Sequence, residues 1–395
     1  MLESLQTPYY LFEENLFVHN IDRFCSVFRS VYPEFNLAYS FKTNYTPYIC
    51  RLAKDAGCFA EVVSDMEYTL ACRLGFENRK IIYNGPYKGR LLEEHLLKGG
   101  IVNIDNYEEC KRICAFAKQH PEREFRIGLR INMDLGAGFI SRFGLEDGGE
   151  DLRDCVDAIE ACDNLRVVGL HCHIKAPRDP ESWRRRSELM IAAADKYVEG
   201  VPEYINLGSG FLPGRLDQTA EDVEDYCPDY ADYAKEIFAP FLGRYPEGRR
   251  PVVFIEPGRS LITRYIRFFA RVDNIKTIRG RTLATTDGSF HNVGEICSLA
   301  RIPIIVHHLS AGDYYQSIDI MGYTCLEQDV MSPSYSGRLA VGDLLEFRNV
   351  GAYSLVYKPP FICPQCKMFA LRPDGSLEMI MREETFEDVF SKFSE

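Results

Sequence analysis

The sequence predicts a (β/α)8 TIM barrel followed by an antiparallel β-domain. Up to about residue 256, eight short runs rich in β-branched and aromatic residues alternate with stretches of helical periodicity. Such alternation implies parallel strand pairing, and eight units over roughly 250 residues is the size of a closed barrel. From about Leu261 the helical periodicity disappears, and closely spaced turn signals indicate antiparallel strands.

The elements of the barrel can be placed in chain order. A strand-like segment at Tyr9–Phe12 precedes an amphipathic helix from about Glu13 to Val31, and the first barrel strand ends near Lys42. The other expected strands are Cys58–Ser64, Lys80–Asn84, Ile101–Asp105, Phe125–Asn132, Arg166–Ile174, Tyr204–Leu207 and Pro251–Glu256. Helical periodicity is found at Asp65–Leu74, Arg90–Lys98, Tyr107–Lys118 and Trp183–Val198. A doubly wound open sheet is the alternative, but no GxGxxG motif follows the first strand.

Two domains are expected. The barrel is predicted to span residues 13–260, and residues 261–395 together with 1–12 are predicted to form the antiparallel β-domain. Turn signals in the second part include Asp287-Gly288, Gly342-Asp343 and Pro373-Asp374-Gly375. Short strands between such turns are typical of antiparallel sheets.

Composition excludes several classes of partner. The chain has 46 Lys and Arg against 58 Asp and Glu, a net charge of −12 that argues against nucleic acid. We expect no membrane span and no signal peptide, because the sequence lacks a run of about 18 apolar residues and an apolar leader. Fourteen scattered cysteines favour reduced thiols in the cytoplasm. Cys363 and Cys366 form a lone CxxC, and since a zinc site usually needs a second ligand pair, no metal is predicted.

A lysine at the end of a buried strand is the first candidate for chemistry. The run Leu37-Ala38-Tyr39-Ser40-Phe41 is apolar and aromatic, and it ends in Lys42. Desolvation lowers a lysine pKa, and a neutral amine is a nucleophile that can form a Schiff base with an aldehyde. The alternative is a lysine that simply extends its ammonium group into water.

Glycines at the later strand ends point to a phosphate group. Gly208-Ser209-Gly210 follows the seventh predicted strand, and Gly258-Arg259 follows the eighth. The loops after these two strands of a barrel frequently bind phosphate through backbone N–H groups. A phosphorylated ligand is therefore expected at this end of the barrel.

A Schiff-base lysine, a phosphate site and a carboxylate at the eighth strand together suggest pyridoxal 5′-phosphate. Glu256 placed against the pyridine nitrogen would keep it protonated and make the ring an electron sink. His173 is assigned to stack on the ring. Structural readings remain open for both residues, because Glu256 could pair with Arg259 and strand-end histidines are often structural.

Six motifs in order resemble those of the fold-type III pyridoxal-phosphate decarboxylases, the group of diaminopimelate, ornithine and biosynthetic arginine decarboxylases. The barrel motifs are Tyr39-Ser40-Phe41-Lys42-Thr43-Asn44, Gly169-Leu170-His171-Cys172-His173-Ile174, Gly208-Ser209-Gly210 and Glu256-Pro257-Gly258-Arg259. The β-domain motifs are Cys325-Leu326-Glu327-Gln328-Asp329 and Gly351-Ala352-Tyr353. The resemblance implies that Lys42 is the cofactor lysine, that Glu256 faces the pyridine nitrogen and that Gly208, Ser209, Gly210, Gly258 and Arg259 lie near the phosphate. It also implies that Tyr353 contacts the cofactor.

Three departures from the family pattern concern the substrate and the phosphate. Lys175-Ala176 stands where the family usually has Gly-Ser after the stacking histidine. Leu326 replaces the acidic residue after the loop cysteine, which makes the loop resemble the C-L-x-x-D of carboxynorspermidine decarboxylases. No R-P-x-Y follows Asp287-Gly288, where diaminopimelate decarboxylases place an arginine. Arg301 is the candidate if a distal carboxylate has to be bound.

The resemblance implies a homodimeric decarboxylase that removes the α-carboxylate of an amino acid. The substrate is expected to be a diamino acid of the diaminopimelate or ornithine type, or a carboxylated polyamine. Cys325 is expected to enter the partner's active site and protonate Cα, and Asp287 is expected to receive a distal amine of the substrate. The alternatives are an amino-acid racemase of the alanine racemase type, whose arginine at the pyridine nitrogen Glu256 does not match, and a non-enzymatic cofactor carrier or regulator.

Overall fold

The computed structural model describes residues 4–136, 138, 140–211, 230–294 and 302–394. The chain divides into two compact units. Within the described residues, one unit runs from Asn20 to Gly258, and the other joins the residues up to His19 to those from Arg259 onward. The division falls inside the first helix, between His19 and Asn20.

The first unit is a closed barrel of eight parallel strands. The strands are β2 Phe35–Ser40, β3 Phe59–Val62, β4 Ile81–Tyr83, β5 Ile101–Ile104, β6 Phe125–Asn132, β8 Leu165–His171, β9 Tyr204–Asn206 and β10 Val252–Ile255. Neighbours pair in chain order, and the parallel pairing of β10 with β2 closes the ring. The short strand β7 Leu145–Glu146 pairs with the end of β6. Closure excludes the open-sheet alternative and confirms the predicted barrel.

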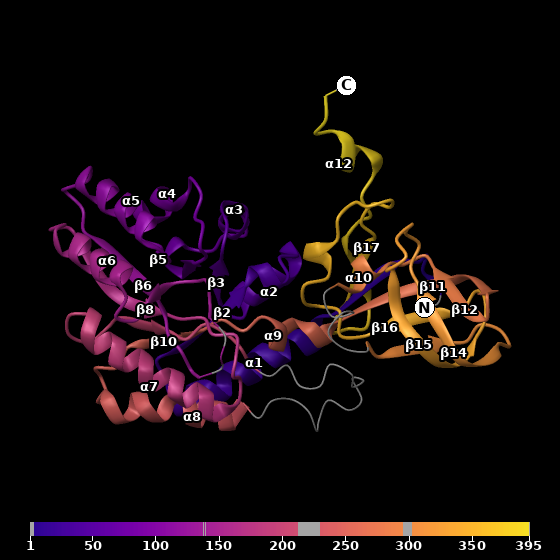
Figure 1. The fold of residues 1–395 in the computed structure, drawn as a ribbon, viewed down its shortest axis with the longest axis horizontal. Helices are drawn as coiled ribbons and strands as arrows, with labels where there is room; N and C mark the ends of the chain where they lie inside the picture. The colour runs from indigo at the N-terminus through magenta and orange to yellow at the C-terminus, as the bar shows by residue number, and fades with distance from the viewer. Residues whose placement is uncertain (1–3, 137, 139, 212–229, 295–301, 395) are drawn as a thin grey trace. The chain divides into compact units, whose positions relative to one another are not determined.

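Helices lie outside the barrel strands (Figure 1). They are α1 Glu14–Val31, α2 Pro47–Asp55, α3 Asp65–Arg73, α4 Leu92–Leu97, α5 Tyr107–Lys118, α6 Glu150–Glu160, α7 Pro180–Tyr197 and α8 Tyr230–Arg244. Side chains of Ser64, Asn106 and Asp179 cap the starts of α3, α5 and α7 by accepting a backbone N–H three residues on. None of the helices in the described part of the chain has the length and apolar character needed to cross a bilayer.

Several elements differ from the sequence-based expectation. The sequence analysis did not place α2, α6 or α8. Helix α8 contains Pro240, a residue that disfavours a helix interior. The buried side of α6, formed by Leu152, Cys155 and Ile159, has ordinary helical spacing. Helix α7 begins at Pro180, three residues before the expected start, because Asp179 caps it. Strand β8 ends at His171, which leaves His173 in the loop that follows.

The second unit contains a nine-stranded sheet, most of it antiparallel as predicted. Its strands are β1 Tyr9–Glu13, β11 Ile266–Ile278, β12 Arg281–Thr286, β13 Ile304–His307, β14 Asp313–Met321, β15 Val330–Leu339, β16 Leu344–Phe347, β17 Lys367–Leu371 and β18 Leu377–Met381. Two pairings are parallel, β1 with β17 and β12 with β14, so the sheet is mixed. Short helices α9 Arg259–Ile262, α10 Phe290–Val293 and α12 Phe386–Phe390 accompany it. Its core includes Tyr9, Leu11, Phe269, Leu344 and Phe369.

Tyr204 packs in the barrel core with Ala38, Ile82 and Phe254, and two glycines make room for it. Tyr204 on β9 crosses the interior, and its hydroxyl donates to Oδ1 of Asn103 on β5 at 2.7 Å. A Cβ at Gly169 would lie 2.4 Å from the Tyr204 ring, and one at Gly128 would lie 2.2 Å from its hydroxyl. Both glycines are therefore required by space rather than by backbone conformation.

We expect Gly169→Ala to destabilise the fold by about 1–3 kcal/mol, the usual cost of forcing an extra methyl into a packed interior. Urea unfolding measures the loss. Gly243→Ala on α8 is the matched control, since a Cβ there meets nothing within 4 Å and alanine favours a helix. In a Tyr204→Ala background the cost of Gly169→Ala should fall. Equal costs in the two backgrounds would contradict this account of the packing.

Candidate functional site

Lys42 lies just beyond the end of β2, where the chain makes a 3-10 turn at Phe41–Thr43. The side chains before and after it are buried, whereas that of Lys42 is 31% exposed. Its Nζ forms an ion pair with Oε2 of Glu61 on β3, and Glu61 is buried. The same oxygen accepts a hydrogen bond from Ser40 Oγ at 2.6 Å. A buried carboxylate thus holds the lysine head at the mouth of the barrel, and the ammonium is not isolated by burial as the sequence suggested.

Glu256 follows β10, and its carboxylate is buried among polar groups of the other strand ends. Oε1 accepts from Asn84 Nδ2 at 2.7 Å and from Asn206 Nδ2 at 2.6 Å. Oε2 lies 3.4 Å from Nε2 of His171.

The charge state of this cluster follows from its surroundings. Burial by itself raises the pKa of Glu256, but His171 and Lys42 outweigh burial and lower the pKa to about 2. Burial lowers the pKa of His171, so this imidazole is neutral near pH 7. Two amide donors and a nearby lysine therefore keep Glu256 ionised at neutral pH, although its carboxylate is almost completely removed from water.

The polar groups form one chain of contacts around the barrel mouth. Asn84 Nδ2 also contacts Glu61 Oε1 at 3.3 Å, and its Oδ1 accepts from Asn103 at 2.8 Å. This chain links Lys42 to Glu256 through Glu61 and Asn84. Lys42 and Glu256, the predicted cofactor lysine and the predicted partner of the pyridine nitrogen, therefore belong to one hydrogen-bond network.

The loop of Gly208, Ser209 and Gly210 packs against the segment that follows β8. The N–H of Ser209 donates to Nδ1 of His173 at 3.3 Å, which makes that nitrogen an acceptor. Burial, together with the charges of Lys42 and Arg130, lowers the pKa of His173 well below its usual value. His173 is thus a neutral ring fixed by a backbone N–H, as a side chain that stacks on a flat ligand requires.

Glycine is required at two of the predicted phosphate-site positions. Gly208 has φ +64°, and a Cβ there would lie 2.2 Å from the carbonyl oxygen of Cys172. A Cβ at Gly258 would lie 2.2 Å from Oγ1 of Thr43. The loops after β8, β9 and β10 and the turn that holds Lys42 therefore approach one another more closely than side chains would permit.

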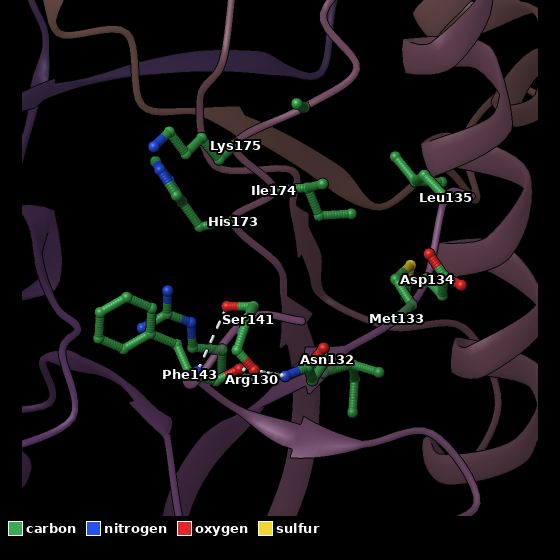
Figure 2. A pocket seen from close by; sticks show the side chains of 12 residues that line it. Arg130, Asn132, Met133, Asp134, Leu135, Ser141, Phe143, His173, Ile174 and Lys175 are labelled. Carbon is green, nitrogen blue, oxygen red and sulfur yellow. Dashed lines mark hydrogen bonds between the residues drawn. The ribbon is translucent and has the colours of Figure 1, made fainter. Parts of the chain in front are cut away.

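A cavity of about 270 Å³ is lined by this network. Its lining includes Lys42, Glu61, Asn84, His173 and Glu256. A second cavity of about 200 Å³ shares Arg130, Phe143 and His173 with the first. Figure 2 shows the side chains of His173 and Lys175 extending in one direction and Ile174 in the opposite one. The size, the buried anion and the lysine fit a pyridine ring that carries an aldehyde.

The remaining predicted residues belong to the second unit. The guanidinium carbon of Arg259 lies 5.2 Å from the centre of the Tyr353 ring, so these two predicted cofactor-site residues are neighbours. Cys325 is exposed. Asp329, at the other end of its loop, is buried and accepts from Phe290 N, Thr324 N and Thr324 Oγ1 at 2.6–3.0 Å. Asp329 thus fixes the conformation of the loop that presents Cys325.

Asp287, the predicted partner of a distal amine, makes two contacts within its own unit. Its Oδ2 accepts from Thr7 Oγ1 at 2.5 Å, and its Oδ1 accepts from the backbone N–H of Arg271 at 2.7 Å. The two carboxylate oxygens therefore tie the N-terminal segment to β11. The expected contact of Asp287 with a distal amine stays a prediction. Arg301, the other candidate for the distal end of the substrate, lies outside the described residues.

Sequence reasoning missed two residues of the site, Glu61 and Asn206, and one buried cation outside it, Arg186. Glu61 and Asn206 each interrupt an apolar strand, which was the available signal. Arg186 stands in the run Arg184-Arg185-Arg186, which is typical of an exposed helix face, and no signal marked it.

Comparisons with known proteins agree with this geometry. The profile described as pyridoxal-dependent decarboxylase, pyridoxal binding domain, matches residues 18–263. The diaminopimelate decarboxylase of Methanothermobacter thermautotrophicus is 26% identical over 408 residues, which cover 98% of this chain and 92% of the relative. That of Bacillus subtilis is 22% identical, with 98% and 92% covered.

Solved structures share the fold. The crystal structure of the diaminopimelate decarboxylase from M. jannaschii superposes with a TM-score of 0.84 at 24% identity and covers 99% of this chain and 92% of that one. The arginine decarboxylase of Paramecium bursaria Chlorella virus bound to agmatine gives 0.73 at 19% identity, with 91% and 94% covered.

The family match spans more than half of the chain and includes the barrel strands that present Lys42, His173 and Glu256. The chain therefore belongs to the pyridoxal-dependent decarboxylases, and it is an amino-acid carboxy-lyase whose cofactor is pyridoxal 5′-phosphate.

Proposed function

We propose that the protein removes the α-carboxylate of a diamino acid in an active site completed by a second copy of the chain. The observation that supports it best is Glu256, an ionised carboxylate buried in the same cavity as Lys42. The diamino class is suggested by relatives named diaminopimelate decarboxylase that align over nearly the whole chain. The racemase alternative lacks support, because a racemase of the alanine type uses an arginine in place of this carboxylate.

The proposed roles follow from the contacts. Lys42 would hold the cofactor through its aldehyde group, and Glu61 pairs with the lysine head at the mouth of the barrel. His173 covers one face of the ring, and the loop Gly208–Gly210 and the Gly258-Arg259 pair surround the phosphate. Pyridoxal phosphate, when bound, supplies an electron sink for the charge left at Cα as CO2 departs. Glu256 holds the proton on the pyridine nitrogen that makes the sink effective.

The identity of the diamino acid is proposed from the loop that contains Cys325. Leu326 brings no charge to the position beside the cysteine, and the carboxylate of Asp287 is occupied within its own unit. We therefore infer that the distal end of the substrate is not held by a carboxylate next to Cys325. Carboxylated polyamines and diaminopimelate both meet this condition.

We expect CO2 release from at least one diamino acid in a panel of meso-diaminopimelate, L-ornithine, L-lysine, L-arginine and carboxynorspermidine. Borohydride reduction of the holoenzyme, followed by peptide mapping, should place the pyridoxyl group on Lys42. CO2 release confined to amino acids with one amino group would contradict the substrate class. A label on another lysine would contradict the role of Lys42.

Replacing Glu256 by Gln should lower kcat by roughly 10²–10³-fold, the usual effect of removing one preorganised electrostatic group from an active site. Glutamine keeps an oxygen for Asn84 and Asn206, so cofactor affinity should change little. Single-turnover CO2 release measures the chemical step, and absorbance titration measures cofactor binding. An unchanged chemical step with normal cofactor content would refute the assignment.

The proposal of shared sites predicts complementation between two inactive variants, Lys42→Ala and Cys325→Ala. A mixed dimer has one site with both defects and one site with neither. Random reassortment at equal amounts makes half of the dimers mixed, so activity should return to about a quarter of wild type. Cys363→Ala, which changes another exposed cysteine, is the matched control and should stay active alone. Demonstrated subunit exchange without recovery would show that Lys42 and Cys325 act within one chain.

A further inference from the structure

Arg186 on α7 is a cation that the site described above does not use. Its neighbours Arg184 and Arg185 are exposed, but Arg186 is completely buried. The guanidinium carbon lies 3.9 Å from the centre of the Trp183 ring, so one face of the group is covered by an aromatic side chain. A buried guanidinium costs several kcal/mol of desolvation and persists where its surroundings compensate the charge.

Three backbone carbonyls receive the N–H groups of Arg186. Nη1 donates to the oxygens of Leu207 at 3.1 Å and Ser209 at 2.8 Å. Nη2 donates to the oxygen of Ile174 at 3.1 Å. These carbonyls come from the loops after β8 and β9, so one side chain ties together the two segments that contain His173 and Gly208–Gly210.

The carbonyl bonds fix the direction of the neighbouring amides. In a trans peptide the C=O of one residue and the N–H of the next point in opposite directions. Because Arg186 draws the oxygens of Ser209 and Ile174 toward itself, the N–H groups of Gly210 and Lys175 point away from it. The N–H groups of Gly208 and Ser209 donate within the protein, to Asn206 Oδ1 and His173 Nδ1. An anion at this point would therefore meet the amides of Gly210 and Lys175, which come from the two loops that Arg186 joins.

The charge of Arg186 is not neutralised within the described residues. No carboxylate lies within ion-pair distance of it there, and its Nε has no hydrogen-bond partner among them. Burial lowers the pKa of Arg186 to about 10, which leaves the group protonated at neutral pH. A Cβ at Gly210 would lie 3.5 Å from its Nη2, so the charge sits directly behind the loop.

We propose that Arg186 is the positioning residue of the cofactor phosphate: it turns the loop amides toward the phosphate and supplies positive potential from behind them. The role goes beyond those assigned above, and it rests on the proposed phosphate site at Gly208–Gly210. It also accounts for the missing serine after His173, because a buried cation replaces an exposed hydroxyl as the source of affinity for the anion.

Trp183 provides a direct signal for this site. It is the sole tryptophan of the chain, it is buried, and its ring stacks on Phe211, the residue after Gly210, at 4.4 Å between ring centres. Its fluorescence therefore reports on the surroundings of Arg186 and of the loop without any contribution from catalysis.

The test compares the affinities of the apoprotein for pyridoxal phosphate and for pyridoxal, which lacks the phosphate. The dissociation constant for pyridoxal divided by that for pyridoxal phosphate isolates the contribution of the phosphate to binding. Arg186→Met should reduce this ratio on the order of 10–100-fold, as expected for loss of charge-assisted binding, and leave pyridoxal affinity within about twofold. Arg186→Lys keeps the charge but not the three-carbonyl geometry and should give an intermediate ratio. Arg184→Ala, on the exposed face of the same helix, is the control and should keep the wild-type ratio.

If Arg186 only stabilised the fold, Arg186→Met would lower the affinities for both ligands by the same factor. An unchanged ratio in Arg186→Met therefore overturns the proposal. If neither Arg186 variant folds, titration of the wild-type apoprotein with inorganic phosphate decides the question. Trp183 fluorescence and the Nε–H resonance of Arg186 should both respond, and silence of both overturns the proposal. A ratio near one in the wild-type protein would show that the phosphate is not bound at the proposed site. Failure of CO2 release in the substrate panel would contradict only the proposed function.

Discussion

The buried carboxylate of Glu256 is the constraint on which the rest of the active site depends. An ionised carboxylate out of water is costly unless donors surround it, and the barrel supplies these from three different strand ends. Asn84 serves Glu256 and also reaches Glu61, which holds Lys42. A change at one strand end is therefore felt at the others, since a donor shared between two carboxylates cannot move toward one without leaving the other.

The fold and the chemical class could be predicted because both depend on repeated or local patterns. Alternating strand and helix periods fixed the barrel, and the contiguous motif around Lys42 and the motif Glu256-Pro257-Gly258-Arg259 indicated the cofactor. Contacts between distant segments could not be predicted in this way. Asp287 matched a motif position, yet its carboxylate is occupied by Thr7, a residue 280 positions earlier in the chain.

Burial is the property that sequence patterns indicated least well. The sequence left open whether Lys42 loses its charge by desolvation or extends into water, and in the fold a neighbouring carboxylate in β3 pairs with it at a partly exposed position. The sequence predicted no functional role for Arg186, because it lies in a run of three arginines that is typical of an exposed helix face. The other two arginines are indeed exposed. In both cases the outcome depends on which neighbour the fold provides, a tertiary fact that residue spacing along one element does not contain.

Glu256 and Arg186, two of the buried charges of the barrel, have opposite signs, and this arrangement matches the charge distribution of the cofactor. Glu256 is an anion held by neutral amides, and Arg186 is a cation held by neutral carbonyls. Each is oriented by dipoles rather than cancelled by an opposite charge in direct contact, so each keeps a field at the cavity that water screens only weakly. A ligand with a protonated ring nitrogen at one end and a phosphate at the other supplies both missing charges at once. Pyridoxal without its phosphate supplies only one, and this selects the complete cofactor over its dephosphorylated form.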